Sequence, residues 1–350
     1  MPQQIDDILD SGKVEFITGD LSKPGLGLDL SVRERVRDEV TCVINTAANI
    51  SLVENLENSI RDNCQTAVAL LQMASEFKHV QLFIHFSSLA VTSFLHGGAI
   101  EERLYPPPGT LDPEAELAGL PGADPSKVKP DDRYAWPYAQ AKHLAERLLL
   151  QSSSVPVLII RPSAIGPAIA EPFPLYGPDK AIPMHTMLHS FRLSDHDLER
   201  MGATDHVFEE VPVDLVANCC LLHLANKTAG VVHCASPLYV TQTASEVMST
   251  TRKAISPAEM AQVMRKKSAS TAFMWQNKYQ LDNLDQTPSW RVDCKRSEYQ
   301  KVVTGPLALC PKEHDPQAHL QRRIRRMYRV MLLSANEESN YRPQHCCERT

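Results

Sequence analysis

The length, composition and charge of this chain exclude several classes of protein. With 350 residues, of which 43% are hydrophobic and 22% charged, it is long enough for a large α/β domain and a smaller appendage. Its net charge of -6 argues against a nucleic-acid-binding protein, which needs a basic surface. Its nine cysteines form no CxxC pair, which argues against a disulfide framework or a zinc site and favours a reducing, cytoplasmic compartment.

The sequence predicts neither a signal peptide nor a transmembrane segment. The N-terminal stretch MPQQIDDILD is acidic and has no apolar core of the kind that signal peptides need. The longest apolar run, Val211–Ala225, is interrupted by Asp214 and is too short to cross a bilayer.

Apolar, β-branched segments that end in small or polar residues are typical of buried parallel strands. The segments of this kind are Lys13–Thr18, Thr41–Asn45, Val80–Phe86 and Val155–Ile160. Helical patterns over Leu56–Phe77 and Tyr138–Gln151 lie between them. This alternation predicts an α/β, Rossmann-like fold, in which helices cover both faces of a parallel sheet.

The chain changes character along its length. Residues 97–133 are rich in proline and predict a long loop, and such loops are usually functional. From about residue 241 strand signals fade, so we expect a reductase-like domain over 1–240 and a small, mostly helical region over 241–350 that ends in a disordered tail. Residues 319–332 predict a basic helix, which either attaches to a membrane surface or is a solvated, packed helix.

Three side chains form the candidate catalytic site. Tyr138 and Lys142 are four residues apart in a helical pattern, so they share one face. There Lys142 can lower the pKa of the phenol, and Tyr138 can donate a proton to a carbonyl oxygen as hydride arrives. Ser87 and Ser88 follow the third predicted strand, where ligands of an open α/β sheet bind, and a hydroxyl there can polarise the same carbonyl.

Several residues at other strand ends are candidates for binding a cofactor. Gly19-Asp20-Leu21 follows the first predicted strand, where the aspartate can accept from an adenine amine or simply form a turn. Ala47 and Ala48 are small enough to let the backbone approach a cofactor closely. Asn63 is a poor helix former inside a helical pattern, which indicates a tertiary hydrogen bond. Pro162, in the motif that closes the fourth strand, completes the set.

Six segments resemble, in order, parts of the NAD-binding domain of the fatty acyl-CoA reductases, which are extended short-chain dehydrogenases/reductases. They are GDLSKPGLGL (19–28), INTAANISLVENLENSIRDNCQTAVALLQMA (44–74), FIHFSSLAV (83–91), YAQAKHLAERLL (138–149), IIRPSAIGPAIAEPFP (159–174) and VFEEVPVDLVANC (207–219). Carboxylic acid reductases and other thioester reductases share much of this pattern. The resemblance covers roughly residues 13–240. The first and fifth segments are its most specific parts, because general extended short-chain dehydrogenases lack them.

The resemblance implies a role for each candidate residue. Ser88 would polarise the carbonyl, with Ser87 as the runner-up, and Tyr138 would be the acid. Lys142 would assist Tyr138 and also bind the nicotinamide ribose. The remaining residues would bind the dinucleotide along its adenine or backbone, and they are Gly19, Asp20, Leu21, Ala47, Ala48 and Asn63.

The activity implied by the resemblance is reduction of a fatty acyl-CoA, or a related acyl thioester, to an aldehyde or alcohol. NADPH is assigned as the cofactor only through the resemblance, and NADH stays an alternative. Two other functions are open: an extended short-chain dehydrogenase acting on a free carbonyl, and a non-catalytic remnant of a reductase. The sequence does not indicate an oligomeric state.

The sequence departs from the family in its N-terminal part. The family opens with a strand and a TGxxGFxG turn that binds the cofactor pyrophosphate, and no such motif occurs here. We therefore expect an N-terminally truncated sheet that lacks the first βαβ unit and binds its cofactor less well. Thr66 and Leu89 also replace a glycine and an alanine that are usual in the family.

Other polar clusters are weaker candidates. His185 and His189 are spaced for one helix face, but no third ligand is evident, so we expect no metal site. Glu209–Glu210 with Asp214 is more typical of a surface and a helix start than of acid/base chemistry. Apolar residues of 173–201 either line an acyl channel or pack in a core.

Overall fold

The structure is a computed structural model of the chain. It describes residues 3–95, 97–107, 112–118, 130–151, 154–177, 205–259, 261–262, 290–298, 302, 304–309 and 314–337. Two compact units are distinguished. The first comprises residues 1–176, 209–241 and 287–312, and the second comprises 177–208, 242–286 and 313–350.

The centre of the first unit is a four-stranded parallel sheet. Its strands are β1 (Cys42–Asn45), β2 (Leu82–Phe86), β4 (Val157–Pro162) and β7 (Gly230–Cys234), hydrogen-bonded in that order. β1, β2 and β4 confirm three of the predicted strands, whereas β7 was not predicted. Because all four strands run in the same direction, their carboxyl ends meet at one edge of the sheet.

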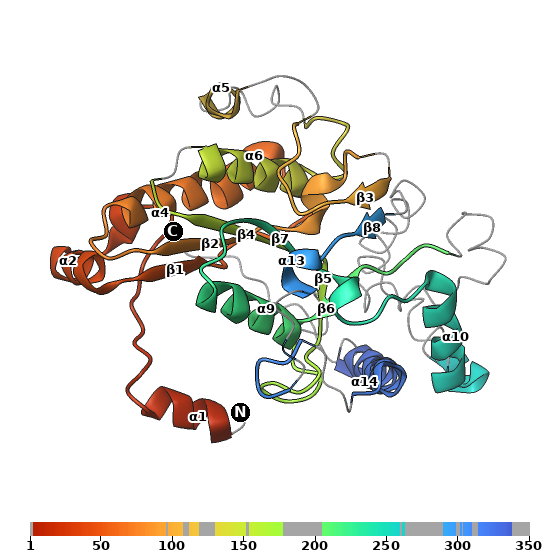
Figure 1. Ribbon diagram of the computed structural model, residues 1–350. Helices are drawn as coiled ribbons and strands as arrows, with labels where there is room; N and C mark the ends of the chain where they lie inside the picture. The colour runs from red at the N-terminus through yellow and green to blue at the C-terminus, as the bar shows by residue number, and fades with distance from the viewer. Residues whose placement is uncertain are drawn as a thin grey trace, which may run out of the picture. The chain divides into compact units, whose positions relative to one another are not determined.

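Helices cover both faces of this sheet (Figure 1). One face is covered by a continuous helical run, consisting of α3 (Leu56–Ile60), the π-helical turn η2 (Arg61–Gln65) and α4 (Thr66–Ser75), together with α6 (Pro137–Gln151). The other face is covered by α9 (Val213–Ala225). The predicted α/β, Rossmann-like architecture is thereby confirmed.

Alternating side chains of the central strands supply a core on each side. Leu82 and Ile84 of β2 pack toward Leu215 and Cys219 of α9. Phe83, between them, packs in the opposite direction with residues of α4. Strands buried on both faces explain why the sequence shows continuous apolar runs rather than alternation.

The prediction of a strand at Lys13–Thr18 is wrong. This segment has no strand pairing, and its apolar side chains are exposed, with Phe16 at 81%. A strand exists only where a neighbour satisfies its backbone groups, and the described sheet ends at β1, so this segment has no partner there.

Two small parallel pairs flank the main sheet. The predicted loop 97–133 contains β3 (Gly98–Ile100), which pairs with β8 (Trp290–Val292), and α5 (Pro113–Ala118). β5 (Ala164–Gly166) pairs with β6 (Glu210–Pro212). The remaining short elements are α1 (Gln3–Asp10), η1 (Pro24–Gly27), α2 (Leu30–Glu39), η3 (Leu89–Thr92), η4 (Ser236–Leu238) and α13 (Lys295–Glu298).

The described part of the second unit is mainly helical. α10 (Ala244–Ala254) begins with a capping box between Thr243 and Glu246, which satisfies the free N–H groups of its first turn. α14 (Pro316–Glu337) confirms the helix predicted over 319–332. Within the described ranges, no helix is both long and apolar enough to cross a membrane. His185, His189 and the predicted disordered tail after residue 337 lie outside the described residues.

Candidate active site

The predicted catalytic helix places its lysine against the end of a central strand. Tyr138 and Lys142 lie one turn apart in α6, as the sequence predicts. Lys142 is 1% exposed, and its Nζ donates a hydrogen bond of 2.9 Å to the carbonyl oxygen of Phe86, the last residue of β2. This bond fixes the lysine at the edge of the sheet where the strands end.

Ser88 lies beside the phenol of Tyr138. Its backbone is extended (φ -156°, ψ 148°), and its Oγ caps η3 by accepting from the N–H of Ala90 at 3.2 Å. The hydroxyl of Ser88 is also close enough to the phenol of Tyr138 to act on its pKa, which it lowers. Since the capping bond uses only a lone pair of Oγ, the Ser88 proton stays available for donation. The structure therefore brings the predicted serine and tyrosine together.

The two serines after β2 face different surroundings. Successive residues of extended chain point in opposite directions, so Ser87 and Ser88 cannot share a partner. Ser87 is buried near the carboxylate of Glu146, whose pKa it helps to lower, although the geometry is not that of a complete hydrogen bond. Of the two serines, Ser88 is the one that acts on the pKa of Tyr138, and its role in polarising a carbonyl stays a prediction.

Burial controls the acidities of the site. It raises the pKa of Tyr138, and the nearby hydroxyl of Ser88 opposes this shift. Burial also lowers the pKa of Lys142 to about 8, opposed by the nearby carboxylate of Glu146. The expected lowering of the Tyr138 pKa by Lys142 is not found, because burial raises this pKa and only Ser88 opposes the rise. The phenol is therefore fully protonated at neutral pH.

A buried ion pair lies behind the lysine. Glu146 follows Lys142 by four residues in α6, and Arg161 lies in β4. Arg161 Nε donates to Glu146 Oε1 at 2.9 Å and Nη2 donates to Oε2 at 2.5 Å, and both side chains are fully buried. A planar guanidinium matches a carboxylate in this bidentate way, which ties the catalytic helix to a central strand.

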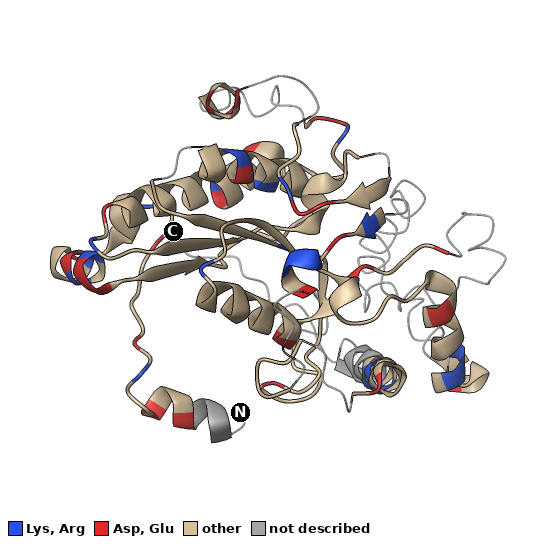
Figure 2. Ribbon diagram, viewed as in Figure 1, with Lys and Arg blue, Asp and Glu red and all other residues tan. Residues whose placement is uncertain are grey.

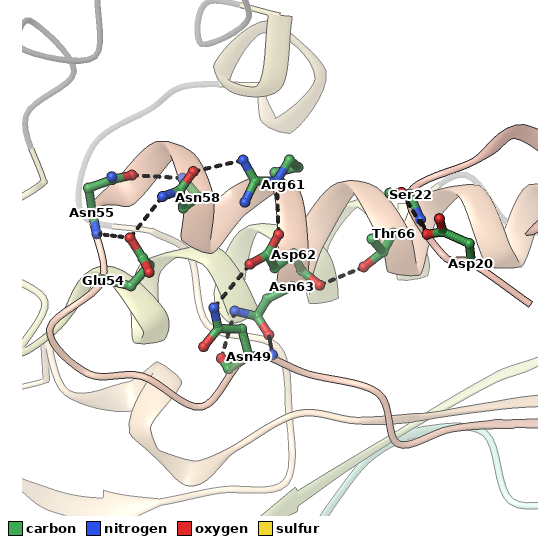
Figure 3. A network of polar contacts seen from close by, with 10 residues as sticks. All are labelled: Asp20, Ser22, Asn49, Glu54, Asn55, Asn58, Arg61, Asp62, Asn63 and Thr66. Carbon is green, nitrogen blue, oxygen red and sulfur yellow. Dashed lines mark hydrogen bonds and ion pairs between the residues drawn. The ribbon is translucent and has the colours of Figure 1, made fainter. Parts of the chain in front are cut away.

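Asn63 makes the tertiary bonds that the sequence predicts. Its Oδ1 accepts from the N–H of Asn49 at 3.0 Å, and its Nδ2 donates to the carbonyl of Asn49 at 3.0 Å (Figure 3). Asp62 adds a bond to the Asn49 side chain at 3.0 Å. Asn63 is 1% exposed and lies in the π-helical turn η2, a distortion that is often found at functional sites. It fixes the loop that follows β1.

The loop fixed by Asn63 exposes small residues at the carboxyl end of β1. Ala47 and Ala48 are exposed, and the N–H of Ala47 is bonded to Asn45 Oδ1 at 3.2 Å. The methyl side chains of these two alanines are too small to keep a ligand away from the backbone. Pro162 is buried at the end of β4, level with the end of β2.

Gly19, Asp20 and Leu21 form a turn on the surface. The carboxylate of Asp20 accepts from the backbone and hydroxyl of Ser22 at 2.9 and 2.6 Å, and these bonds lower its pKa. Asp20 thus makes the local bonds of a turn former, and it lies apart from the buried cluster around Lys142.

Sequence reasoning did not single out Glu146 and Arg161, which pair beside Lys142. The spacing Tyr138, Lys142, Glu146 was a signal for Glu146, since residues four apart share a helix face. Nothing local identified Arg161 as its partner. Asp214 lies at a helix start, as the sequence predicts: it is in the first turn of α9, where it accepts from the N–H groups of Ile169 and Ala170 and so holds the loop after β5. Among the described residues, no group of His, Cys, Asp and Glu has the arrangement of a metal site.

Comparisons with known proteins identify the family of this chain. A family model described as "Male sterility protein" matches residues 3–220. The chain is 29% identical over 217 residues to fatty acyl-CoA reductase 1 of Gallus gallus, covering 60% of this chain and 41% of that protein. It is 29% identical over 191 residues to the alcohol-forming fatty acyl-CoA reductase of Simmondsia chinensis, covering 47% of this chain and 39% of that protein. The chain thus spans less than half the length of these relatives.

Solved structures support the fold. The reductase domain of the aureusimine biosynthetic cluster is similar with a TM-score of 0.60 at 13% identity, covering 94% of this chain and 77% of that one. The terminal R domain of the myxalamid biosynthetic pathway has a TM-score of 0.59 at 16% identity, covering 92% and 75%. From the family match over most of its sequence and the Rossmann-like sheet, we conclude that this chain belongs to the male sterility protein family of NAD-binding domains.

Proposed function

We propose that this chain reduces a fatty acyl-CoA, or a related acyl thioester, with NADPH to an aldehyde or alcohol. The observation that supports this most strongly is the contact between Ser88 and Tyr138 at the end of β2, with Lys142 buried one helical turn away. The matched relatives from Gallus gallus and Simmondsia chinensis are both named as fatty acyl-CoA reductases, which favours a thioester over other carbonyl substrates.

The described residues fit the nicotinamide end of such a cofactor. We place the nicotinamide ribose at Lys142 and the dinucleotide backbone along Ala47 and Ala48, where exposed backbone leaves room. Asn63 holds this loop through its two bonds to Asn49, and we place Pro162, at the end of β4, beside the cofactor. We place the adenine along the surface turn that Gly19, Asp20 and Leu21 form.

Each catalytic side chain has a definite task in the reaction. The thioester carbonyl oxygen accepts hydrogen bonds from Ser88 and Tyr138, which make its carbon more electrophilic. When bound, the reduced nicotinamide supplies a hydride to that carbon. Tyr138 gives its proton to the oxygen, so a hemithioacetal forms, and the charge of Lys142 stabilises the phenolate left behind.

Release of the aldehyde follows from the same groups. The hydroxyl proton of the hemithioacetal returns to the Tyr138 phenolate while the carbon–sulfur bond breaks, and the CoA thiolate takes a proton from solvent. A second hydride and a second proton from Tyr138 would convert the aldehyde to the alcohol. Nothing in the site distinguishes the first carbonyl from the second, because both need the same two hydrogen bonds.

We also propose a reducing, cytoplasmic environment. All six cysteines in the described residues are free thiols, and the buried ones among them are Cys64, Cys219, Cys220, Cys234 and Cys294. Free buried thiols are ordinary in a reducing compartment.

The test uses the purified chain with a long-chain acyl-CoA and a long-chain ketone, each with NADPH and with NADH. We expect oxidation of NADPH that depends on acyl-CoA and a product detected by mass spectrometry. One CoA thiol should be released for each NADPH oxidised if the product is the aldehyde, and one for every two if it is the alcohol. Reduction of the ketone but not of the thioester would replace the proposal with a free-carbonyl dehydrogenase. Absence of turnover with both substrates would indicate a non-catalytic relative.

A further inference from the structure

Positive charge is concentrated on one helix of this acidic protein. α14 contains five arginines and one glutamate, so its charge is 5 − 1 = +4, whereas the whole chain has a net charge of -6. Arginine positions are blue on α14 in Figure 2. The positive charge is therefore a local feature of α14 and does not follow from the overall composition of the chain.

The arginines of α14 divide between its faces. Arg322, Arg325 and Arg329 are exposed, and their spacing of three and then four residues places them in one stripe along the helix. We call these three residues the arginine stripe. The apolar face, with Leu320, Ile324 and Met327, is buried against α10. The apolar face therefore already has its partner, whereas the arginine stripe has none among the residues that the structure describes.

The arginine stripe also lacks the neutralising neighbours that other surface arginines have. On α2, Arg33, Arg35 and Arg37 each lie within 4 Å of a carboxylate, on Glu76, Glu15 and Asp38 respectively. No carboxylate of the described residues lies within ion-pair distance of the arginine stripe. Arg325 helps to lower the pKa of Glu259, but the carboxylate of Glu259 is bonded to the backbone and hydroxyl of Ser256.

We propose that the arginine stripe docks this protein on the surface of an anionic lipid bilayer. Three unpaired guanidinium groups in a row complement a plane of phosphate and carboxylate headgroups, and each gains by releasing counterions. The choice of a bilayer rests on the proposed function, since a fatty acyl-CoA and a fatty aldehyde or alcohol are amphiphiles that partition into membranes. Because the apolar face of α14 is buried, docking is electrostatic and involves no insertion.

Vesicle co-sedimentation with the full chain tests this without any catalytic readout. The chain is mixed with vesicles of phosphatidylcholine, with or without phosphatidylserine, at low and high salt. We expect binding only with phosphatidylserine, and its loss at high salt. The triple variant R322Q/R325Q/R329Q should bind about 100-fold more weakly, at about fivefold for each arginine.

The matched control is R33Q/R35Q/R37Q, which removes the same charge from α2 and should leave vesicle binding unchanged. Circular dichroism and thermal unfolding establish that both variants are folded. Equal binding to pure phosphatidylcholine, or equal loss in both triple variants, would overturn the proposal. So would binding of a single-stranded RNA oligonucleotide through the arginine stripe as tightly as vesicles, because the stripe would then be a general polyanion site. Failure of docking leaves the reductase proposal intact, since turnover is measured separately without lipid.

Discussion

The two sides of the main sheet differ in how completely their strands are enclosed. β4 has a neighbour on each side, and all six of its residues are buried. β1 has β2 on one side only, and Ile44 in its centre is 42% exposed. The apolar segment Lys13–Thr18 has no strand neighbour and is not a strand. An apolar, β-branched sequence therefore forms a buried strand only where its neighbours complete the backbone pairing.

The candidate site residues also fall into two groups, which differ in whether their hydrogen bonds are tertiary or local. Tyr138, Lys142 and Ser88 lie around β2 and are fixed by tertiary bonds to buried groups. Asp20 and Ala47 lie toward the open side and make mainly local bonds. The proposed site of proton transfer is thus partly held by a tertiary bond, whereas the proposed site for the far end of the cofactor is formed by local turns.

The first prediction compares Phe83, which lies in the sheet, with Phe16, which lies outside it. Phe83 of β2 is fully buried, so Phe83→Ala should lower the free energy of unfolding by about 3–5 kcal/mol. Phe16 is 81% exposed, so Phe16→Ala should change it by less than about 0.5 kcal/mol. Urea denaturation followed by circular dichroism measures both. Similar losses at the two positions would mean that Lys13–Thr18 is packed, contrary to the structure.

The second prediction concerns the ion pair behind the active site. Arg161→Leu leaves the Glu146 carboxylate buried without its partner, which should lower the free energy of unfolding by about 3–5 kcal/mol. Replacing both residues by leucine removes the uncompensated charge, so the double variant should be more stable than Arg161→Leu alone. If the single variant unfolds at the wild-type urea concentration, the pair does not fix α6 to β4.

A smaller effect is expected at the loop after β1. Asn63→Ala removes both bonds to Asn49 and should lower the free energy of unfolding by about 1–3 kcal/mol. Because the loop borders the cofactor position, the KM for NADPH should rise while kcat changes little. Asn58→Ala is the matched control, since Asn58 bonds only to residues of its own neighbourhood such as Glu54. A loss of kcat with an unchanged KM would place Asn63 elsewhere in the mechanism.

The pH dependence of turnover should report Lys142. Its pKa is lowered to about 8, so the lysine is charged below that pH and loses its proton above it. Burial raises the pKa of Tyr138, so the phenol keeps its proton throughout this range. If charged Lys142 is required, the rate at saturating substrate should fall about tenfold per pH unit above pH 8. A flat profile between neutral and alkaline pH would exclude this role.

The sequence predicts much of the fold because the relevant signals are local. Continuous apolar runs identify β1, β2 and β4, and helical spacing identifies α6 and α14. β7 escaped prediction because its apolar, β-branched run consists only of Val231 and Val232, which His233 ends. Lys13–Thr18 was predicted wrongly because the pattern of a strand does not reveal whether a partner exists.

The candidate site, too, could be predicted from local signals but not where it depends on tertiary contacts. The spacing of Tyr138 and Lys142 and the position of Ser88 after a strand could be read from the sequence. The choice of Ser88 over Ser87 required coordinates, since it depends on which of two opposite directions faces α6. The pairing of Glu146 with Arg161 joins residues of different elements, and no local pattern encodes it.

The two adjacent serines allow the most direct test of the central claim, that Ser88 and Tyr138 together polarise and protonate the substrate carbonyl. Acyl-CoA-dependent oxidation of NADPH is measured for wild type, Ser87→Ala, Ser88→Ala and Tyr138→Phe. The account predicts that Ser88→Ala and Tyr138→Phe each lower kcat by about 10²–10³-fold, while Ser87→Ala stays close to wild type. Equal losses in the two serine variants, or full activity in Tyr138→Phe, would contradict it.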